Sequence, residues 1–261
     1  MTSETFLTID DTPITISQIF RYLQASRKLE PFIGDLVRQF VLERELQRQD
    51  LQISPAAVEQ AVIDFRLQQK LVEPQQFQNW LTENNTTFEA FYAQIANNFR
   101  LQKLKEISSE PRLQDYFIER KIYLDRVVLS RLIVDNAELA DELKSQLAEG
   151  ASFEQLVREY SVTDDRVMNG MLGPVSRGSM PDVLRAAIDL AKPGDVIGPL
   201  ELEGRWGLFR IEDFLPASLE NPQLQQTLRD ELFEQWLNER MQQLPIRIQI
   251  GEPQPEPAQI P

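Results

Sequence analysis

Residues 169–180 read NGMLGPVSRGSM, and this run of glycines between apolar and small residues gives the first indication of the fold. Eight of the ten glycines lie between Gly150 and Gly207, which confines tight turns to this part of the chain. Closely spaced turns can bring two apolar side chains of the run, Leu172 and Met180, together. The stretch therefore predicts a small apolar site inside a compact module.

The sequence around this run alternates between strand-like and helix-like patterns, beginning at residue 125. Residues 127–134 form a β-rich run, and an acidic amphipathic helix is expected from about Ala137 to Glu149. A capping-box pattern at Ser152 and Gln155 then opens a second helix. A third helix is expected near residues 182–190, and short strands near residues 197–202 and 206–211. These elements predict an α+β domain at residues 125–216.

The chain before this domain, residues 1–124, is expected to be helical. A short extended start at residues 6–9 and a turn at residues 10–13 come first, and four or five helices follow. Their starts are indicated by three patterns: capping boxes at Thr15 with Gln18 and at Thr86 with Glu89, and the pair Ser54-Pro55. Glu110-Pro111 is expected to interrupt the helical run before a further helix through Tyr116, Phe117 and Tyr123.

One stripe of apolar residues in this helical part has two interpretations. Its members recur with helical spacing and stack on one helix face: Phe88, Phe91, Tyr92, Ile95 and Phe99. Such a stripe usually packs in a core, but it also fits a groove for apolar peptides.

Residues 217–250 are expected to form a long acidic helix and a strand that return to the helical domain. The helix begins at Pro222 and has one apolar face: Leu224, Leu228, Leu232, Trp236 and Met241. The strand is expected at residues 246–250, where it would pair with residues 6–9 or with the helical part. Residues 251–261 contain four prolines and are expected to be a disordered tail.

Composition excludes several classes of function. The chain has 27 Lys and Arg against 41 Asp and Glu, and this net charge of −14 disfavours nucleic-acid binding. It has no His and no Cys, so histidine bases, thiol nucleophiles, zinc sites and disulfides are excluded. No metal or cofactor is expected. No membrane span is expected either, and a start without a basic leader favours a cytoplasmic location.

The glycine-rich run resembles the hallmark of the parvulin family of peptidyl-prolyl cis-trans isomerases. The hallmark positions are matched by Gly170, Leu172, Gly173, Arg177, Gly178 and Met180, and further family-like pieces follow in order at residues 128–134, 150–153, 160–161 and 193–199. The resemblance covers roughly residues 126–214. It implies a small antiparallel sheet with surrounding helices, no cofactor, and a proline pocket at Leu172, Met180 and Leu184.

The flanking parts resemble the helical peptide-holding regions of SurA- or PrsA-like bacterial chaperones, in which a C-terminal helix completes an N-terminal bundle. The implied architecture is therefore a parvulin-like domain inserted between an N-terminal helical bundle and a C-terminal helix. Proteins of that kind are exported, whereas this chain begins without a recognisable export signal.

The polar positions of the pocket depart from the family pattern. Arg131 replaces the first-strand histidine, Gly207 the last-strand histidine, and Thr163 the usual Cys or Asp. Thr163 remains a candidate to donate a hydrogen bond near the imide, and Arg131 to pair with Asp164 or with substrate carbonyl groups. Each candidate also has a structural interpretation: Met180 and Leu184 as a buried helix start, and Gly178 and Thr163 as turn residues. Trp206 is expected to pack behind the sheet, whereas an edge position would place it near the substrate.

Two functions follow from the resemblance. The first is an isomerase acting on Xaa-Pro bonds of unfolded or precursor polypeptides, weakened by the absence of the histidines. The alternative is a non-catalytic, parvulin-derived chaperone or an accessory protein of peptide maturation or export. In both cases the expected partners are proline-containing polypeptides, and the acidic charge favours basic ones. The sequence does not define the oligomeric state.

Overall fold

The computed structural model describes residues 5–248, and the chain packs as two compact units. Among the described residues, the helical unit comprises 5–111 with 229–248, and the sheet unit comprises Arg112–Leu228. Both divisions fall inside helices, α5 (Phe88–Leu124) and α9 (Pro222–Gln242), whereas the boundaries predicted from the sequence, 124/125 and 216/217, follow the ends of α5 and β6. The predicted tail, residues 251–261, lies outside the described residues.

The sheet unit contains a four-stranded antiparallel sheet with the strand order β4-β3-β6-β5. Its strands are β3 (Arg126–Val134), β4 (Met171–Ser176), β5 (Val196–Leu202) and β6 (Arg205–Leu215). This confirms the expected α+β domain between two helical segments. Strand β4 was not expected, because Gly173 and Pro174 are typical of loops; as an edge strand, β4 can contain a proline.

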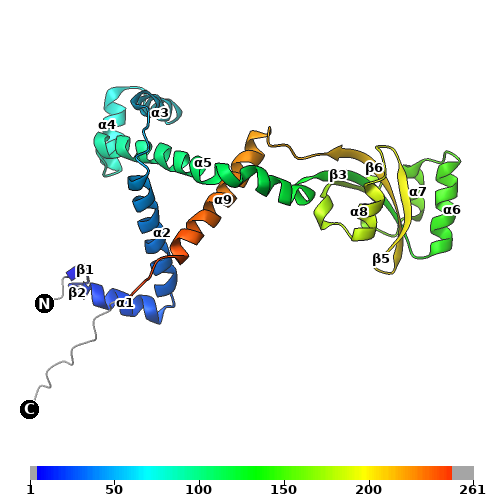
Figure 1. Ribbon diagram of the computed structural model, residues 1–261, viewed down its shortest axis with the longest axis horizontal. Helices are drawn as coiled ribbons and strands as arrows, with labels where there is room; N and C mark the ends of the chain where they lie inside the picture. The colour runs from blue at the N-terminus through cyan, green and yellow to red at the C-terminus, as the bar shows by residue number, and fades with distance from the viewer. Residues whose placement is uncertain (1–4, 249–261) are drawn as a thin grey trace, which may run out of the picture. The chain divides into compact units, whose positions relative to one another are not determined.

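Helices cover both faces of this sheet, and alternation along β3 separates two cores. Leu129 and Ile133 pack with helix α8 (Asp182–Ile188) on one face. Leu132 and Val134 pack with helices α6 (Ala137–Ala148) and α7 (Phe153–Tyr160) on the other (Figure 1). Trp206 packs against this second core, as expected for a residue behind the sheet. Arg131 lies two residues from both Leu129 and Ile133 in the strand, so its side chain is on the same face as theirs, the α8 face.

Helix α7 is held on the sheet by Arg210 of β6. The Arg210 guanidinium lies 4.8 Å from the ring centre of Phe153, and its Nη1 donates to Glu154 Oε1 at 2.7 Å. Hydrogen bonds from the backbone N–H of Glu154 itself, from Arg210 and from Ser152 lower the pKa of the Glu154 carboxyl to about 2. Because these donors favour the ionised form, Glu154 stays charged well below its ordinary range.

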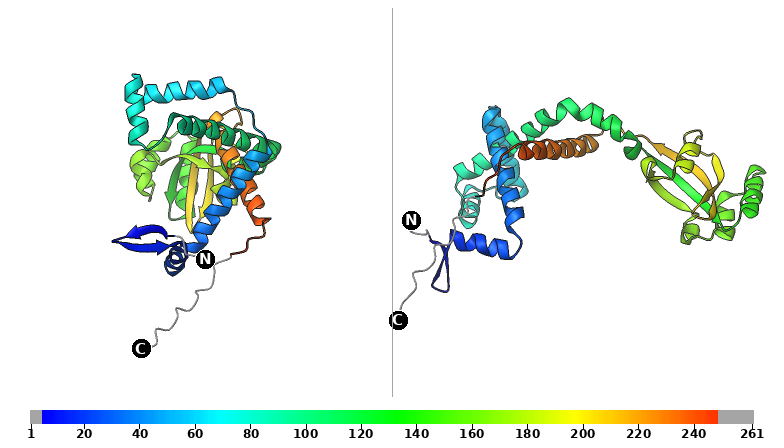
Figure 2. Two further views of the ribbon diagram at one scale, coloured as in Figure 1. Left: turned by 90° about the vertical axis from the view of Figure 1, so that its left-hand side faces the viewer. Right: turned by 60° about the horizontal axis from the view of Figure 1, so that its bottom comes forward.

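The helical unit begins with a hairpin of two short strands, β1 (Thr5–Ile9) and β2 (Thr12–Thr15), which projects from helix α1 (Ile16–Ala25) (Figure 2). Asp10 and Asp11 both have positive φ, which is typical of a two-residue hairpin turn. Residues 12 and 13 therefore belong to β2 and not to the turn. The extended start expected at residues 6–9 is confirmed.

The remaining helices are α2 (Leu29–Arg48), α3 (Pro55–Gln68) and α4 (Pro74–Glu83), with parts of α5 and α9. The predicted capping box opens α1, where the N–H of Gln18 donates to Thr15 Oγ1 at 3.3 Å. At α5 the prediction was wrong by one residue. Thr87, not Thr86, accepts from the N–H of Ala90 and precedes the first helical residue.

The apolar stripe of α5 packs in a core. Phe91 is buried together with Val62 of α3 and with Phe77 and Leu81 of α4, and Tyr92 and Ile95 pack against this cluster. Phe88, at the start of the stripe, is 46% exposed. Of the two interpretations left open by the sequence, core packing therefore holds for the middle of the stripe.

Helix α9 shares a second core with α2 and α5. Its buried residues Phe233 and Leu237 pack with Val41 and Leu104, so the C-terminal helix completes the helical unit. The strand expected at residues 246–250 was wrong for residues 246–248, which have no strand structure, and residues 249–250 lie outside the described residues. Strand β1 pairs instead with β2, its neighbour along the chain.

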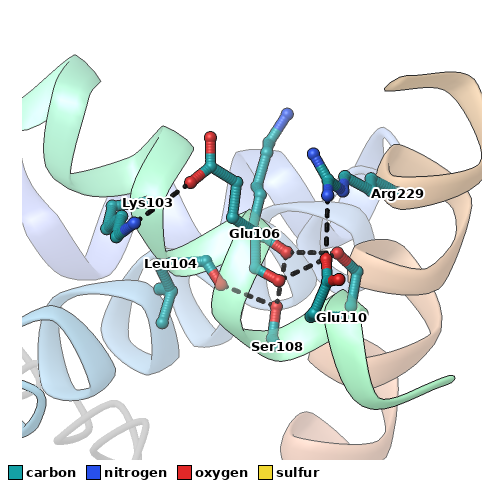
Figure 3. Close-up of polar contacts among 8 residues, drawn as sticks. Lys103, Leu104, Glu106, Ser108, Glu110 and Arg229 are labelled. Atoms are coloured by element: carbon teal, nitrogen blue, oxygen red, sulfur yellow. Dashed lines mark hydrogen bonds and ion pairs between the residues drawn. The ribbon is translucent and has the colours of Figure 1, made fainter. Parts of the chain in front are cut away.

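Helix α5 continues through Pro111, contrary to the interruption expected there. In the turn before the proline, the Ser108 hydroxyl donates to the carbonyl oxygen of Leu104 at 2.8 Å (Figure 3). Glu110 accepts from Arg229 of α9, also at 2.8 Å. Leu104 and Leu113, on either side of Pro111, are buried. Packing of these segments outweighs the proline, which costs a helix interior about 3 kcal/mol.

Candidate active site

A cleft of about 790 Å³ opens on the α8 face of the sheet. Strands β3, β4 and β6 and the start of α8 supply most of its apolar lining: Leu129, Ile133, Leu172, Val175, Met180, Val183, Leu184 and Phe209. Its polar lining includes Arg131, Thr163, Ser179, Glu201, Glu203 and Arg205. All five residues predicted as site residues, Leu172, Met180, Leu184, Thr163 and Arg131, thus lie around one cleft. Their roles stay predictions.

The apolar wall of the cleft is continuous with the core of the sheet unit. Met180 and Leu184 are 6% and 5% exposed and pack with Ile188 and Phe209, whereas Leu172 is 36% exposed. Met180 and Leu184 are therefore both a buried helix start and a surface of the cleft. Because core packing fixes their rotamers, the wall is preorganised.

Arg131, Asp165 and Thr163 form a hydrogen-bonded chain at the polar side of the cleft. Arg131 Nε donates to Asp165 Oδ2 at 2.6 Å, and the Thr163 hydroxyl donates to Asp165 Oδ1 at 2.5 Å. The predicted partner of Arg131, Asp164, was wrong. A 3-10 helix begins directly after Thr163, and the second acidic residue of its first turn faces Arg131. Arg131 is thus held at the wall of the cleft.

Ser161 extends this chain into the sheet and was not predicted. It is 2% exposed, its hydroxyl lies 3.0 Å from Thr163 Oγ1, and it accepts from the N–H of Ile133 at 3.3 Å. Ser161 therefore connects the loop that carries Thr163 to strand β3. In the sequence, Ser161 is part of a family-like dipeptide at residues 160–161, but the dipeptide does not indicate what the Ser161 side chain does.

Glycines set the backbone of the site. A Cβ atom on Gly170 would lie 2.0 Å from the carbonyl oxygen of Arg131, and the N–H of Arg131 donates to Gly170 O at 2.8 Å. A Cβ atom on Gly207 would lie 2.6 Å from the Phe209 ring. The Phe209 ring thus fills the space beside the position where the parvulin pattern has its last-strand histidine.

Residues 5–248 were compared with the requirements of a metal site and of a membrane-spanning helix, and they meet neither. Within residues 5–248, no three acidic side chains come together in a geometry suited to a metal ion. In the same range, no helix combines the length and the apolar character that a membrane span requires.

Comparison with known protein families identifies the sheet unit. Residues 131–213 match the Rotamase family, described as the PPIC-type PPIASE domain. These residues include all five predicted site residues and most of the sheet. The sheet unit therefore contains a parvulin-type domain, which confirms the resemblance carried by residues 169–180.

Curated relatives share similarity beyond this domain. Foldase protein PrsA 2 of Listeria innocua serovar 6a is 26% identical over 178 residues, which are 60% of this chain and 60% of the relative. Foldase protein PrsA 1 of the same organism is 30% identical over 127 residues, 47% of this chain and 42% of the relative. The chain thus spans about half the length of these relatives. It contains a PPIC-type domain, and its similarity to PrsA foldases extends beyond that domain.

Solved structures include similar chains. A crystal structure of the peptidylprolyl isomerase PrsA from Bacillus cereus is 17% identical and covers 93% of this chain and 90% of its own, with a TM-score of 0.41. A crystal structure of a PpiC-type isomerase domain is 21% identical and covers 37% of this chain and 97% of its own, with a TM-score of 0.35.

Proposed function

We propose that this protein is a peptidyl-prolyl cis-trans isomerase that acts on Xaa-Pro bonds of unfolded or precursor polypeptides. One observation carries the proposal: the five residues predicted from the sequence line a single apolar cleft within the PPIC-type domain. The relatives named as foldases support the same class of activity. The cytoplasmic location stays a prediction.

The cleft suits the physical demands of the reaction. Rotation about an Xaa-Pro bond must break amide resonance, and uncatalysed isomerisation takes tens to hundreds of seconds. In the proposed complex, Leu172, Met180 and Leu184 surround the proline ring and exclude water from the imide. An environment with little water disfavours the polar planar amide relative to the twisted transition state.

The polar chain positions the substrate in this proposal. Because its Nε is bound to Asp165, Arg131 has its Nη1 and Nη2 groups available to donate to a substrate carbonyl oxygen. The single proton of Thr163 is directed at Asp165, so Thr163 acts through Asp165 and not directly on the imide. This arrangement substitutes for the histidine pair and predicts modest activity.

The test is NMR exchange spectroscopy on Xaa-Pro peptides with the wild-type protein and the Met180→Ala variant. Met168→Ala is the matched control, because Met168 is 63% exposed and does not line the cleft. Accelerated exchange that is reduced by Met180→Ala and unchanged by Met168→Ala supports an isomerase. If the wild-type protein binds peptide without acceleration, the isomerase proposal is wrong.

A second function, holding of unfolded polypeptides, is favoured by an apolar groove in the helical unit. The groove measures about 310 Å³ and is lined by Leu36, Val37 and Phe40 of α2 and by residues 244–246. Leu36 and Phe40 are 53% and 56% exposed, and exposed apolar patches usually bind a partner. We expect Phe40→Ser to weaken prevention of aggregation and Met180→Ala to weaken only isomerisation. Equal loss of both activities in Met180→Ala would contradict this division.

A further inference from the structure

The turn that precedes Met180 is held by the end of helix α5. This turn, Arg177–Ser179, is a 3-10 helix, and Met180 follows it directly. Helix α5 ends at Leu124, and its last turn places Tyr123 against the 3-10 turn. The residues concerned, from Lys121 to Ala217, all belong to the sheet unit.

Tyr123 covers the turn through its ring. A Cβ atom on Gly178 would lie 2.2 Å from Cδ1 of the Tyr123 ring, so the ring sits directly on the glycine backbone. The carbonyl oxygen of Tyr123 also accepts from the Ser176 hydroxyl at 2.7 Å. Only glycine permits this close approach. Gly178 of the family-like motif is therefore required for the contact with Tyr123.

Asp125 fixes the same turn by its charge. It is 7% exposed, and its Oδ1 accepts from Lys121 Nζ and from the N–H of Ala217, both at 2.8 Å. Its Oδ2 lies 3.6 Å from Nη1 of Arg177, and its carbonyl oxygen accepts from the N–H of Arg177 at 3.0 Å. A carboxylate buried with several donors strongly restrains the groups around it.

Arg177 connects this carboxylate to the far end of helix α8. Its Nη2 pairs with Asp189, the residue that caps the C-terminus of α8. Met180 and Leu184, the buried wall of the cleft, lie between the two ends of this connection along the chain. Movement of the Arg177–Ser179 turn therefore moves the wall.

We propose that Tyr123 and Asp125 are positioning residues of the proline pocket: they fix the turn that presents Met180. This inference rests on the proposed isomerase function. Neither residue lines the cleft, so both act through Met180. A displacement of about 1 Å at a site can lower activity by up to about 100-fold, so loss of either support is expected to slow the reaction measurably.

The first test compares Tyr123→Ala with Tyr123→Phe, which keeps the ring. Exchange spectroscopy on an Ala-Pro peptide gives kcat and KM, and a methyl-labelled NMR spectrum reports on Met180. We expect Tyr123→Ala to lower kcat/KM about tenfold and to shift the Met180 methyl signal, while Tyr123→Phe restores both. Ile118→Ala, an exposed position on the same helix, is the control.

The second test uses Asp125→Asn, which keeps the size of the side chain and removes its charge. We expect a lower kcat/KM and a shifted Met180 methyl signal at a temperature where thermal unfolding shows that the variant is folded. A thermally destabilised variant with wild-type kcat/KM at that temperature would show that Asp125 is only a structural residue.

The third test combines Tyr123→Ala with Gly178→Ala. Gly178→Ala alone forces a Cβ atom into the ring and is expected to lower kcat/KM. If ring and glycine act as one contact, the double variant is no worse than Gly178→Ala alone, because coupled sites are not additive.

The outcomes separate the two proposals. Wild-type kcat/KM and an unshifted Met180 methyl signal in Tyr123→Ala overturn the positioning role. No acceleration by the wild-type protein overturns the isomerase function instead. In that case the Met180 methyl signal and the affinity for the Ala-Pro peptide still decide whether Tyr123 and Asp125 shape the pocket.

Discussion

At the scale of single residues, Gly207 shows how tightly the sheet packs beside the cleft. It pairs with Ile133 across the sheet, and the Phe209 ring occupies the space that a side chain at this position would need. A histidine cannot be restored there without moving Phe209, which lines the cleft. The absence of a side chain at position 207 and the placement of the Phe209 ring therefore depend on each other.

Gly207→Ala is expected to destabilise the sheet unit by about 1 to 3 kcal/mol, the usual cost of overpacking a core. Urea unfolding monitored by circular dichroism measures the change. Gly34→Ala is the control, because a Cβ atom on Gly34 in α2 would meet nothing within 4 Å. That control is expected to be neutral or to stabilise by up to about 1 kcal/mol. A neutral Gly207→Ala variant would contradict the packing described around Phe209.

The site was only partly predictable from residues. The position of Leu172, Met180 and Leu184 at one cleft could be predicted from the resemblance to parvulins. Asp165 could not be predicted as the partner of Arg131, because the sequence does not distinguish it from the adjacent Asp164. The 3-10 helix after Thr163 decides which of the two carboxylates faces Arg131. Ser161 was missed for a related reason: its role depends on a long-range hydrogen bond to β3.

At the scale of elements, helix α7 depends on a titratable contact with the sheet. Since the folded-state pKa of Glu154 is lowered from 4.5 to about 2, its ionised form stabilises the fold. This contribution is complete above about pH 4.5 and is lost as the pH falls toward 2.

We expect Glu154→Gln to lower the free energy of unfolding at pH 7 by about 1 kcal/mol or less, because the side chain is partly exposed to solvent. The difference from the wild-type protein should shrink between pH 4.5 and pH 2. Urea unfolding at a series of pH values checks both statements. If the difference in free energy of unfolding grew on acidification, the ionised Glu154 carboxylate would not be the form that stabilises the fold.

Helix α5 and strand β4 show where element prediction fails. Local rules end a helix before a proline and assign Gly-Pro to a loop, but α5 contains Pro111 and β4 contains Pro174. Burial of the α5 face and the edge position of β4 decide both cases. Elements with a clear pattern, such as α6 and β3, were predicted to within one residue at each end, and the cap that opens α7 was predicted as well.

Pro111→Ala restores a backbone N–H and a good helix former within α5. Because the proline ring is exposed and the helix is already formed, we expect stabilisation of about 1 to 3 kcal/mol. Thermal unfolding measures it, and Pro111→Gly, which restores the N–H without the helix propensity, should gain less. A loss of stability in Pro111→Ala would show that α5 requires the proline.

At the scale of the whole molecule, the two units differ in how the chain builds them. The sheet unit is one continuous segment, Arg112–Leu228, with its own cores on both faces of the sheet. The helical unit needs two segments, because α9 supplies Phe233 and Leu237 to a core shared with α2 and α5.

A fragment of residues 112–228 is therefore expected to fold alone and to retain the proposed isomerase activity, since it contains the complete cleft. A dispersed two-dimensional NMR spectrum and the peptide exchange assay test this expectation. Residues 5–111 alone are expected to fold poorly, because they lack α9. A collapsed spectrum for the 112–228 fragment would show that the sheet unit depends on the rest of the chain.

The discontinuous helical unit has a consequence for protein synthesis. A ribosome delivers α2 and most of α5 first, then the whole sheet unit, and only after it the core residues of α9. The parts of α2 and α5 that pack against α9 therefore stay uncovered while more than a hundred residues are translated between Pro111 and Arg229. The sheet unit can fold in that interval, so the helical unit is completed after the sheet unit and is the more exposed of the two to aggregation in the nascent chain.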